Sequence, residues 1–271
     1  MKTYKDFLLV SDLDGTLLNS DKVVSEANKV AINEFVAGGG QFAIATGRTP
    51  DNARGYLQGI TVNSPSIFYN GSLLVDLPSD KILKSCPLNG ILWRQFAAYC
   101  LKKFPQVCLE IYTADRLYIL SEPCYDDPRL TIEKWDYQHI SLAEAADLEW
   151  LKFFLCAPRP ILEQIRSAAA NLKITEVSTN FYSEVNYLEF VGAEVSKGHM
   201  MEVMRQLPVN AGRLVVAAGD YPNDNELLQR ADCGVAPANA VAETKQCANR
   251  VGPDCNHDLW RYIIREVLPS L

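Results

Sequence analysis

Two short acidic segments in this chain of 271 residues each come directly after an apolar run. The sequence DLDGT at residues 12–16 follows the run at 7–11, and GDYPND at residues 219–224 follows the run at 214–218. Open α/β sheets bind ligands at the carboxyl ends of their strands, so we expect the two segments to share one pocket. Several carboxylates in one pocket attract a cation.

Two other segments add groups that bind oxyanions. Thr46, Gly47 and Arg48 end the apolar run that begins at residue 41, and they offer a hydroxyl, a backbone N–H without a Cβ beside it, and a guanidinium. Lys197 stands at the start of a predicted helix. Two acidic strand ends combined with one hydroxyl and one lysine predict a site for phosphate and Mg²⁺.

Each of these segments has an ordinary structural explanation when it is taken alone. D-x-D-G is often only a loop, Lys197 suits a solvated helix surface, and Asp220 and Asp224 suit a first helical turn, where the dipole favours acids. A calcium-binding EF-hand does not fit, because Gly15 stands at the fourth rather than the sixth place of the loop and a strand precedes it. The occurrence of all four segments in order favours the catalytic interpretation.

The composition is that of a globular protein, with 48% hydrophobic and 22% charged residues. The net charge of -7 argues against nucleic acid as a partner, because such binding depends on Lys and Arg that neutralise phosphates. No apolar run approaches the roughly 20 residues that span a bilayer. The N-terminus leads at once into a strand-like run. We therefore expect a cytoplasmic protein without a membrane partner.

Cysteine and histidine are too dispersed to suggest a structural metal site. The eight cysteines include no C-x-x-C pair, so we expect free thiols. The three histidines do not approach the spacing of a zinc site.

Strand and helix signals alternate at both ends of the chain, which predicts an α/β core. Ser25 and the glycines at 38–40 mark the two ends of the first helix. The expected strands lie at 7–11, 41–46, 66–69, 214–218 and 235–236, and the expected helices at 25–37, from 51, at 195–207 and at 224–231.

The middle of the chain has more aromatic residues and a less regular pattern, which predicts an inserted α+β domain. Helices are expected at 91–104, 141–150 and 160–171, and strands at 108–112, 117–120, 151–157 and 187–191. The predicted fold class is therefore a Rossmann-like, doubly wound parallel-sheet core of residues 1–80 and 187–271 with an insertion at 81–186.

The four motifs resemble those of the haloacid dehalogenase (HAD) superfamily. The matching residues are Asp12-Leu13-Asp14-Gly15-Thr16, Thr46, Lys197 and Gly219-Asp220-x-x-Asn223-Asp224. Arg48, Asn70-Gly71 and Ser196-Lys197-Gly198 are similar in particular to the Cof-like phosphatases, which carry a type IIB cap. Arg48 and Lys197 are 149 positions apart, more than one or two strand–helix units need, and this separation independently requires an insertion. The resemblance implies that the insertion is the cap.

The resemblance also implies a role for each matching residue. Asp12 would attack phosphorus, and Asp14 would protonate the leaving oxygen and then activate water. Mg²⁺ would bind Asp12, the backbone carbonyl of Asp14, and Asp220. Thr46, Gly47, Lys197 and Asn223 would hold the phosphate oxygens, and Asp224 would support the metal or Lys197. The implied activity is Mg²⁺-dependent hydrolysis of a small phosphomonoester, such as a sugar phosphate, through an aspartyl-phosphate.

The chain departs from the family pattern at three places, and none of them removes a reacting group. Tyr221-Pro222 replaces a small or polar pair, Pro237 stands where relatives often have Met, and residues 256–259 lack a common Gly. Candidates for contact with the substrate are Arg48, Asn70, Tyr182, Glu184 and Asn186. The identity of the substrate and the oligomeric state stay open.

Two other functions deserve comparison with a phosphatase. A phosphomutase would transfer the phosphoryl group within a sugar, but those relatives usually have Thr where Leu18 stands. A sensor that binds phosphosugars without turnover does not need Asp12 and Asp14, and both are intact.

Overall fold

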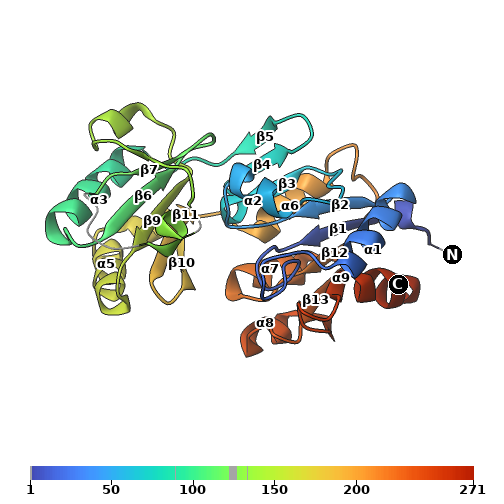
Figure 1. The fold of residues 1–271 in the computed structure, drawn as a ribbon. Helices are drawn as coiled ribbons and strands as arrows, with labels where there is room; N and C mark the ends of the chain where they lie inside the picture. Colours follow the sequence, from blue (N-terminus) through green and yellow to red (C-terminus); the bar gives the residue numbers. More distant parts are fainter. Residues whose placement is uncertain (1, 89, 122–126, 133) are drawn as a thin grey trace. The chain divides into compact units, whose positions relative to one another are not determined.

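The computed structural model describes residues 2–88, 90–121, 127–132 and 134–271 (Figure 1). The chain divides into two compact units: the first comprises Met1–Lys84 and Ser196–Leu271, and the second comprises Ser85–Val195. Among the described helices, none is both long and apolar enough to cross a membrane.

The first unit is built on a parallel sheet with the strand order β14-β13-β12-β1-β2. β1 pairs with β12 on one side and β2 on the other, and all five of its residues are buried. This burial explains its unbroken apolar sequence, because parallel strands are usually covered on both faces. The strands are β1 (Phe7–Ser11), β2 (Gln41–Ile44), β12 (Leu214–Ala218), β13 (Cys233–Pro237) and β14 (Arg250–Gly252).

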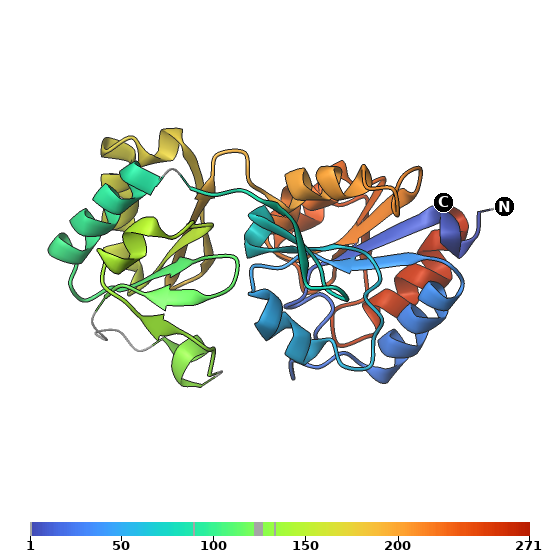
Figure 2. The same ribbon diagram turned by 90° about the horizontal axis from the view of Figure 1, so that it is seen from above.

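Helices cover both faces of this sheet. α1 packs against α9 on one face, and α6 packs against α7 on the other (Figures 1 and 2). Ser25 caps α1 by accepting a hydrogen bond from the backbone N–H of Asn28. The helices are α1 (Glu26–Ala37), α2 (Pro50–Tyr56), α6 (Lys197–Arg205), α7 (Asn225–Arg230), α8 (Ala242–Cys247) and α9 (Leu259–Tyr262).

A small sheet with the order β3-β4-β5 completes the first unit. A single bridge between Ala45 and Ile67 links it to the end of β2. The sharp turn Tyr69–Gly71 connects β3 to β4. The strands are β3 (Ser66–Phe68), β4 (Leu73–Asp76) and β5 (Lys81–Ser85).

The second unit contains a six-stranded sheet with the order β10-β11-β9-β6-β7-β8. Its pairs are antiparallel except for β7 with β8. One face of the sheet packs with helices α3 and α5 in a large apolar core. The elements are α3 (Gly90–Lys103), β6 (Cys108–Tyr112), β7 (Leu117–Ile119), α4 (Pro128–Thr131), β8 (Gln138–His139), β9 (Lys152–Cys156), α5 (Arg159–Asn171), β10 (Ser178–Glu184) and β11 (Tyr187–Gly192).

Two expectations for the second unit need correction. The expected boundary at 186/187 assigned β11 to the core, but β11 pairs with β9 and β10, so this compact unit extends to Val195. The expected helix at 141–150 is only a 3-10 turn at Glu144–Asp147. Trp150 is buried beyond this turn and donates its indole N–H to the carbonyl of Ala145 at 2.9 Å.

Candidate active site

Asp12 occupies the first position after β1. Its backbone N–H donates to the carbonyl of Ala218 at 2.9 Å, which continues the pairing of β1 with β12 by one residue. Its side chain is buried, and one carboxylate oxygen lies 2.7 Å from the ammonium of Lys197. Burial raises the pKa of Asp12 well above its usual range, and the neighbouring carboxylates of Asp224 and Asp220 add to this effect, against the opposing charge of Lys197.

Lys197 reaches two acids of the site at once. It stands at the first position of α6, which is capped by Ser196, and its ammonium donates to Asp12 at 2.7 Å and to Asp224 at 2.6 Å. Burial opposes the charged form, but the two carboxylates outweigh it and raise the pKa of Lys197. Lys197 is therefore a permanently charged, almost fully enclosed cation beside Asp12.

Asp224 also folds the loop that follows β12. Its second carboxylate oxygen accepts the backbone N–H groups of Asp220 and Tyr221, at 3.1 and 3.3 Å. Gly15 leaves room for Asp220, because its φ is +71° and a Cβ there would lie 2.5 Å from a carboxylate oxygen of Asp220. Burial, together with the charge of Asp224, raises the pKa of Asp220 to about 7.

Three carboxylates from these segments have the arrangement of a cation site. Each of Asp12, Asp220 and Asp224 offers an oxygen, and the three oxygens lie within 4.8 Å of one another. Lys197 is the cation that bonds to this group, and its charge is smaller than that of three carboxylates. Hard oxygen donors with excess negative charge fit Mg²⁺, so the donor set agrees with the expected metal.

Asp14 is held outside this group of carboxylates. Arg48 binds both of its oxygens, with Nε at 2.7 Å and Nη2 at 2.8 Å, and the ammonium of Lys22 lies 2.7 Å from one of them. Burial alone would raise the pKa of Asp14, but these bonds and charges lower it to about 2. The carboxylate is therefore ionised and engaged by two cations.

The expected phosphate-binding residues lie together around Asn70. The amide nitrogen of Asn223 donates to the side-chain oxygen of Asn70 at 3.0 Å, and a Cβ at Gly47 would lie 3.0 Å from the side-chain nitrogen of Asn70. The backbone N–H of Asn70 donates to the carbonyl of Thr46 at 3.0 Å. The structure thus brings Thr46, Gly47 and Asn223 to one end of the sheet.

Tyr182, Glu184 and Asn186 belong to the second unit. Tyr182 pairs with Leu188, so its ring lies on the helix-covered face, where the guanidinium of Arg159 stands 3.3 Å from the ring centre. Glu184 is exposed at the end of β10. The contacts of Tyr182 serve the packing of its own unit, and a contact of these three residues with substrate stays a prediction.

Sequence reasoning missed Lys22 and a short chain of hydrogen bonds behind Asp12. The indole N–H of Trp260 donates to the hydroxyl of Ser11 at 2.7 Å, and that hydroxyl donates to the carbonyl of Asp12 at 2.6 Å. Neither feature has a sequence signal, because Lys22 lies in an ordinary polar loop and Trp260 is 249 positions from Ser11.

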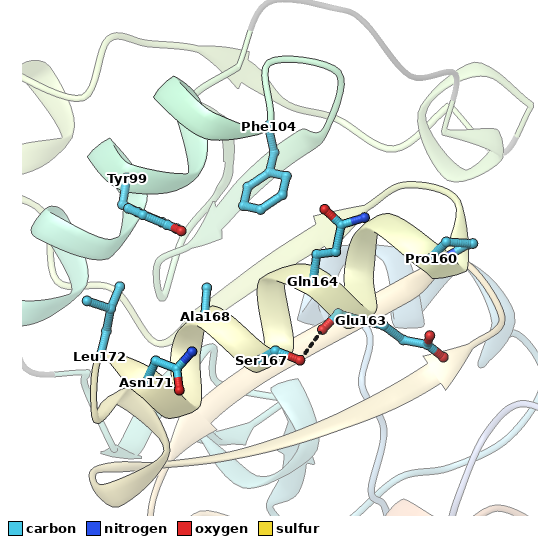
Figure 3. A pocket seen from close by; sticks show the side chains of 9 residues that line it. All are labelled: Tyr99, Phe104, Pro160, Glu163, Gln164, Ser167, Ala168, Asn171 and Leu172. Atoms are coloured by element: carbon cyan, nitrogen blue, oxygen red, sulfur yellow. Dashed lines mark hydrogen bonds between the residues drawn. The ribbon is translucent and has the colours of Figure 1, made fainter.

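A hollow of about 570 Å³ lies elsewhere, between α3 and α5 (Figure 3). Figure 3 shows Tyr99 and Phe104 facing side chains of α5, including Gln164 and Ser167. No Lys or Arg is among its nine lining residues, and Glu163 contributes a negative charge. This hollow does not have the chemistry of a phosphate site.

Comparison with known proteins agrees with this geometry. A family model described as haloacid dehalogenase-like hydrolase matches residues 9–258. The chain is 26% identical over 267 residues to the 5-amino-6-(5-phospho-D-ribitylamino)uracil phosphatase YitU of Bacillus subtilis, with 91% of this chain and 92% of that protein covered.

Two further similarities bear on length and on fold. The chain is 27% identical over 268 residues to the Arabidopsis thaliana protein named endoribonuclease YBEY, chloroplastic; the match covers 91% of this chain but 44% of that protein, so the chain spans less than half of its length. The solved structure of the HAD subclass IIB sugar phosphatase BT4131 has a TM-score of 0.80 at 17% identity and covers 96% of this chain and 98% of its own. This likeness confirms the predicted fold class, an α/β parallel-sheet core with an inserted α+β domain.

Proposed function

Because this chain belongs to the haloacid dehalogenase-like hydrolases, we propose that it hydrolyses a small phosphomonoester through an aspartyl-phosphate formed on Asp12. The observation that carries this proposal is the buried group in which Lys197 joins Asp12 to Asp224, with Asp220 beside them. The names of two relatives, a phosphoribitylaminouracil phosphatase and a sugar phosphatase, favour a phosphorylated metabolite as substrate.

In the first step, a carboxylate oxygen of Asp12 forms a bond to phosphorus while the bond from phosphorus to the ester oxygen breaks. Lys197, at 2.7 Å from Asp12, fixes the direction of the carboxylate and offsets charge on the phosphoryl group. Asp12, Asp220 and the backbone carbonyl of Asp14 would hold Mg²⁺, and the bound ion would supply positive charge that lowers repulsion between the carboxylate and the anionic ester.

Asp14 carries the proton in both steps. It gives a proton to the departing ester oxygen, and in the second step it takes a proton from the water that attacks phosphorus, which restores Asp12 and releases phosphate. Its bonds with Arg48 and Lys22 have to be released before it can carry a proton, because they lower its pKa to about 2 and keep the carboxylate ionised in the structure.

The remaining residues bind the phosphoryl oxygens or support those that do. Thr46 offers a hydroxyl, Gly47 a backbone N–H, Lys197 an ammonium and Asn223 an amide, and donors of these kinds stabilise charge as it develops in the transition state. Asp224 acts as a positioning residue through its bonds to Lys197 and to the backbone of the Asp220 loop.

We further assign the second unit, Ser85–Val195, as the cap that selects the leaving group; the predicted bounds of 81–186 shift because β5 pairs in the first unit and β11 pairs in the second. Arg48 on the core side, and Tyr182, Glu184 and Asn186 on the cap, are the proposed contacts with the substrate.

The seven cysteines in the described part of the chain are free thiols, which supports a cytoplasmic location. Cys124 lies outside the described residues.

The test is a screen of phosphorylated metabolites and an aryl phosphate, read as phosphate release with Mg²⁺ and with EDTA. We expect turnover with Mg²⁺, loss of turnover with EDTA, and recovery when Mg²⁺ is restored. The variant Asp220→Ala should resemble the chelated protein. Full activity in EDTA would overturn the metal assignment, and absence of turnover on every phosphomonoester would overturn the proposed function.

A further inference from the structure

The turn Tyr69–Gly71 has an unusual backbone. Three successive residues have positive φ angles, 51° at Tyr69, 57° at Asn70 and 112° at Gly71, and all three are buried. Glycine accepts such angles readily and asparagine tolerates them, but a bulky residue such as tyrosine rarely adopts them. Strained backbone of this kind persists where the surroundings hold it, and it is found most often at functional sites.

The first neighbour of this turn is the segment that carries Thr46 and Gly47. The backbone N–H of Asn70 donates to the carbonyl of Thr46 at 3.0 Å. The α-carbon of Gly47 faces the Asn70 side chain so closely that a Cβ would lie 3.0 Å from its nitrogen. The turn therefore fixes the position of the Thr46–Gly47 backbone at the end of β2.

The second neighbour is the start of α6, which carries Lys197. A Cβ at Gly71 would lie 2.2 Å from the carbonyl oxygen of Ser196 and 3.0 Å from its nitrogen. Only glycine permits this approach. Any side chain at position 71 would push the backbone of Ser196 away and displace Lys197 with it. The position of Lys197 thus depends on the turn as well as on its own helix.

The third neighbour is Asn223, in the loop after β12. Its amide nitrogen donates one hydrogen to the side-chain oxygen of Asn70 at 3.0 Å. A carboxamide nitrogen has two hydrogens in one plane, so a fixed bond for the first sets the direction of the second. Asn70 is itself buried, with 3% of its surface exposed, and is held by its backbone bond to Thr46.

We infer that the turn Tyr69–Gly71 is a common anchor for the three phosphate-binding segments, and that Asn70 is a positioning residue that aims the amide of Asn223 at the phosphoryl group. This inference rests on the proposed function and refines it, because Asn70 acts through Asn223 rather than by lining the substrate pocket. The strained backbone is what allows one short turn to contact residues 46–47, 196 and 223 together.

The test uses the full chain and the variant Asn70→Gly, which removes the side chain but keeps the positive φ that the turn requires. We expect kcat/KM for an aryl phosphate to fall about 10- to 100-fold, the usual effect of losing a partner that orients a binding residue. Binding of inorganic phosphate in the presence of Mg²⁺, measured by titration calorimetry, should weaken as well. Asp80→Gly is the matched control, since Asp80 also has a positive φ but is exposed, and it should keep wild-type values.

Comparison with Asn223→Ala separates positioning from other effects. If Asn70 acts through Asn223, the double variant should be no worse than Asn223→Ala alone, in turnover and in phosphate binding. Fully additive losses, or wild-type values for Asn70→Gly in an active enzyme, would overturn the inference and leave the proposed function intact. A wild-type chain that neither turns over the ester nor binds phosphate would overturn both.

Thermal denaturation of each variant controls for folding. If Asn70→Gly unfolds below the assay temperature, Asn70→Ser replaces it, because serine is too short to reach Asn223 and the same losses are expected. If Asn70→Ser is folded and has wild-type kinetics and phosphate binding, the inference is wrong.

Discussion

Each unit of this protein contains a buried group of charged side chains, and the two groups differ in how completely they are neutralised. In the first unit, Asp12 and Asp224 share one lysine while Asp220 lies beside them, and the three acids lie beyond strand ends. In the second unit, the charges lie on the sheet face opposite the helices or reach it from α4. That group consists of Glu110, Asp127 and Glu189 with Arg129 and Lys152.

The group in the second unit is closed on itself. Arg129 donates to Glu110 at 2.8 Å, to the hydroxyl of Tyr112 at 2.8 Å, and to Asp127, and its guanidinium lies 3.8 Å from the centre of the Phe154 ring. The ammonium of Lys152 lies 2.7 Å from Glu189. Each of these five charged side chains has an opposite charge within bonding distance.

The difference separates a site for a ligand from a support for the fold. Carboxylates at strand ends with too little positive charge are ready to receive a cation and an anionic ester. A group in which every acid is bonded to a cation, and which is attached to strand interiors, instead holds a segment against its sheet. Mutations in the first group should therefore change turnover more than stability, and mutations in the second should do the reverse.

The largest effect on turnover is expected for Asp12→Asn. An amide does not readily attack phosphorus, so turnover should fall by more than about 10⁴-fold. The melting temperature should not fall, because burial raises the pKa of Asp12 and makes its ionised form costly in the folded chain. Steady-state kinetics and thermal denaturation check the two halves of this prediction. If Asp12→Asn kept activity within tenfold of wild type, the first group would not be the catalytic one.

The largest effect on stability is expected for Arg129→Met. The change leaves the acids at 110 and 127 buried without their cation, and breaking a buried pair in this way costs about 3–5 kcal/mol. Urea denaturation followed by tryptophan fluorescence measures it, since Trp93, Trp135 and Trp150 all lie in the second unit. Arg116→Met, in the exposed turn between β6 and β7, should change stability little. Equal losses for both variants would contradict the structural role.

A smaller and pH-dependent effect is expected for Glu110→Gln. Burial raises the pKa of Glu110 from 4.5 to about 7, with Arg129 opposing the shift. The folded chain then holds a proton that the unfolded chain releases, so this group makes stability fall as pH rises from about 4.5 to about 7. Melting temperatures at pH 5 and pH 7.5 should drop more in wild type than in the variant. An equal drop in both would show that Glu110 does not titrate in this range.

The smallest effect is expected for Lys22→Met, which removes an exposed partner of Asp14 beside the first group. Its side chain is 51% exposed, and Arg48 keeps both of its own bonds to Asp14. An exposed ion pair contributes up to about 1 kcal/mol, so turnover should change by no more than about fivefold. Arg48→Met removes the buried partner of Asp14 and should lower turnover much more. Equal losses in kcat for the two variants would show that Lys22 is as important as Arg48.

Sequence reasoning succeeded where a single physical rule sets the structure. Continuous apolar runs identified β1 and β12, and the rule that ligands bind at strand ends predicted that Asp12 and Asp220 would lie together. Lys197 is 185 positions from Asp12, yet the order of motifs was enough to place both in one pocket.

It failed where the answer depends on packing between distant segments. The carboxylate of Asp14 turns to Arg48 and Lys22 rather than to Asp12, and the motif spacing contains no information about that rotation. The predicted boundary at 186/187 separated the strand expected at 187–191 from the other strands of the insertion, and only the pairing of β11 with β9 and β10 shows that it belongs with them. In the sequence, Asn70-Gly71 was visible only as a point of resemblance to the Cof-like phosphatases, with Asn70 as a candidate contact for the substrate.

The most direct test of the catalytic account is to trap the phosphoryl group on Asp12. In Asp14→Asn, an activated aryl phosphate has a leaving group that needs little protonation, so attack by Asp12 should survive better than the water step that follows. Rapid acid quench and peptide mapping should then find the acyl-phosphate on Asp12, with much less from an alkyl ester. A phosphate adduct on another residue, or wild-type rates for Asp14→Asn on a sugar phosphate, would contradict the roles assigned to the two aspartates.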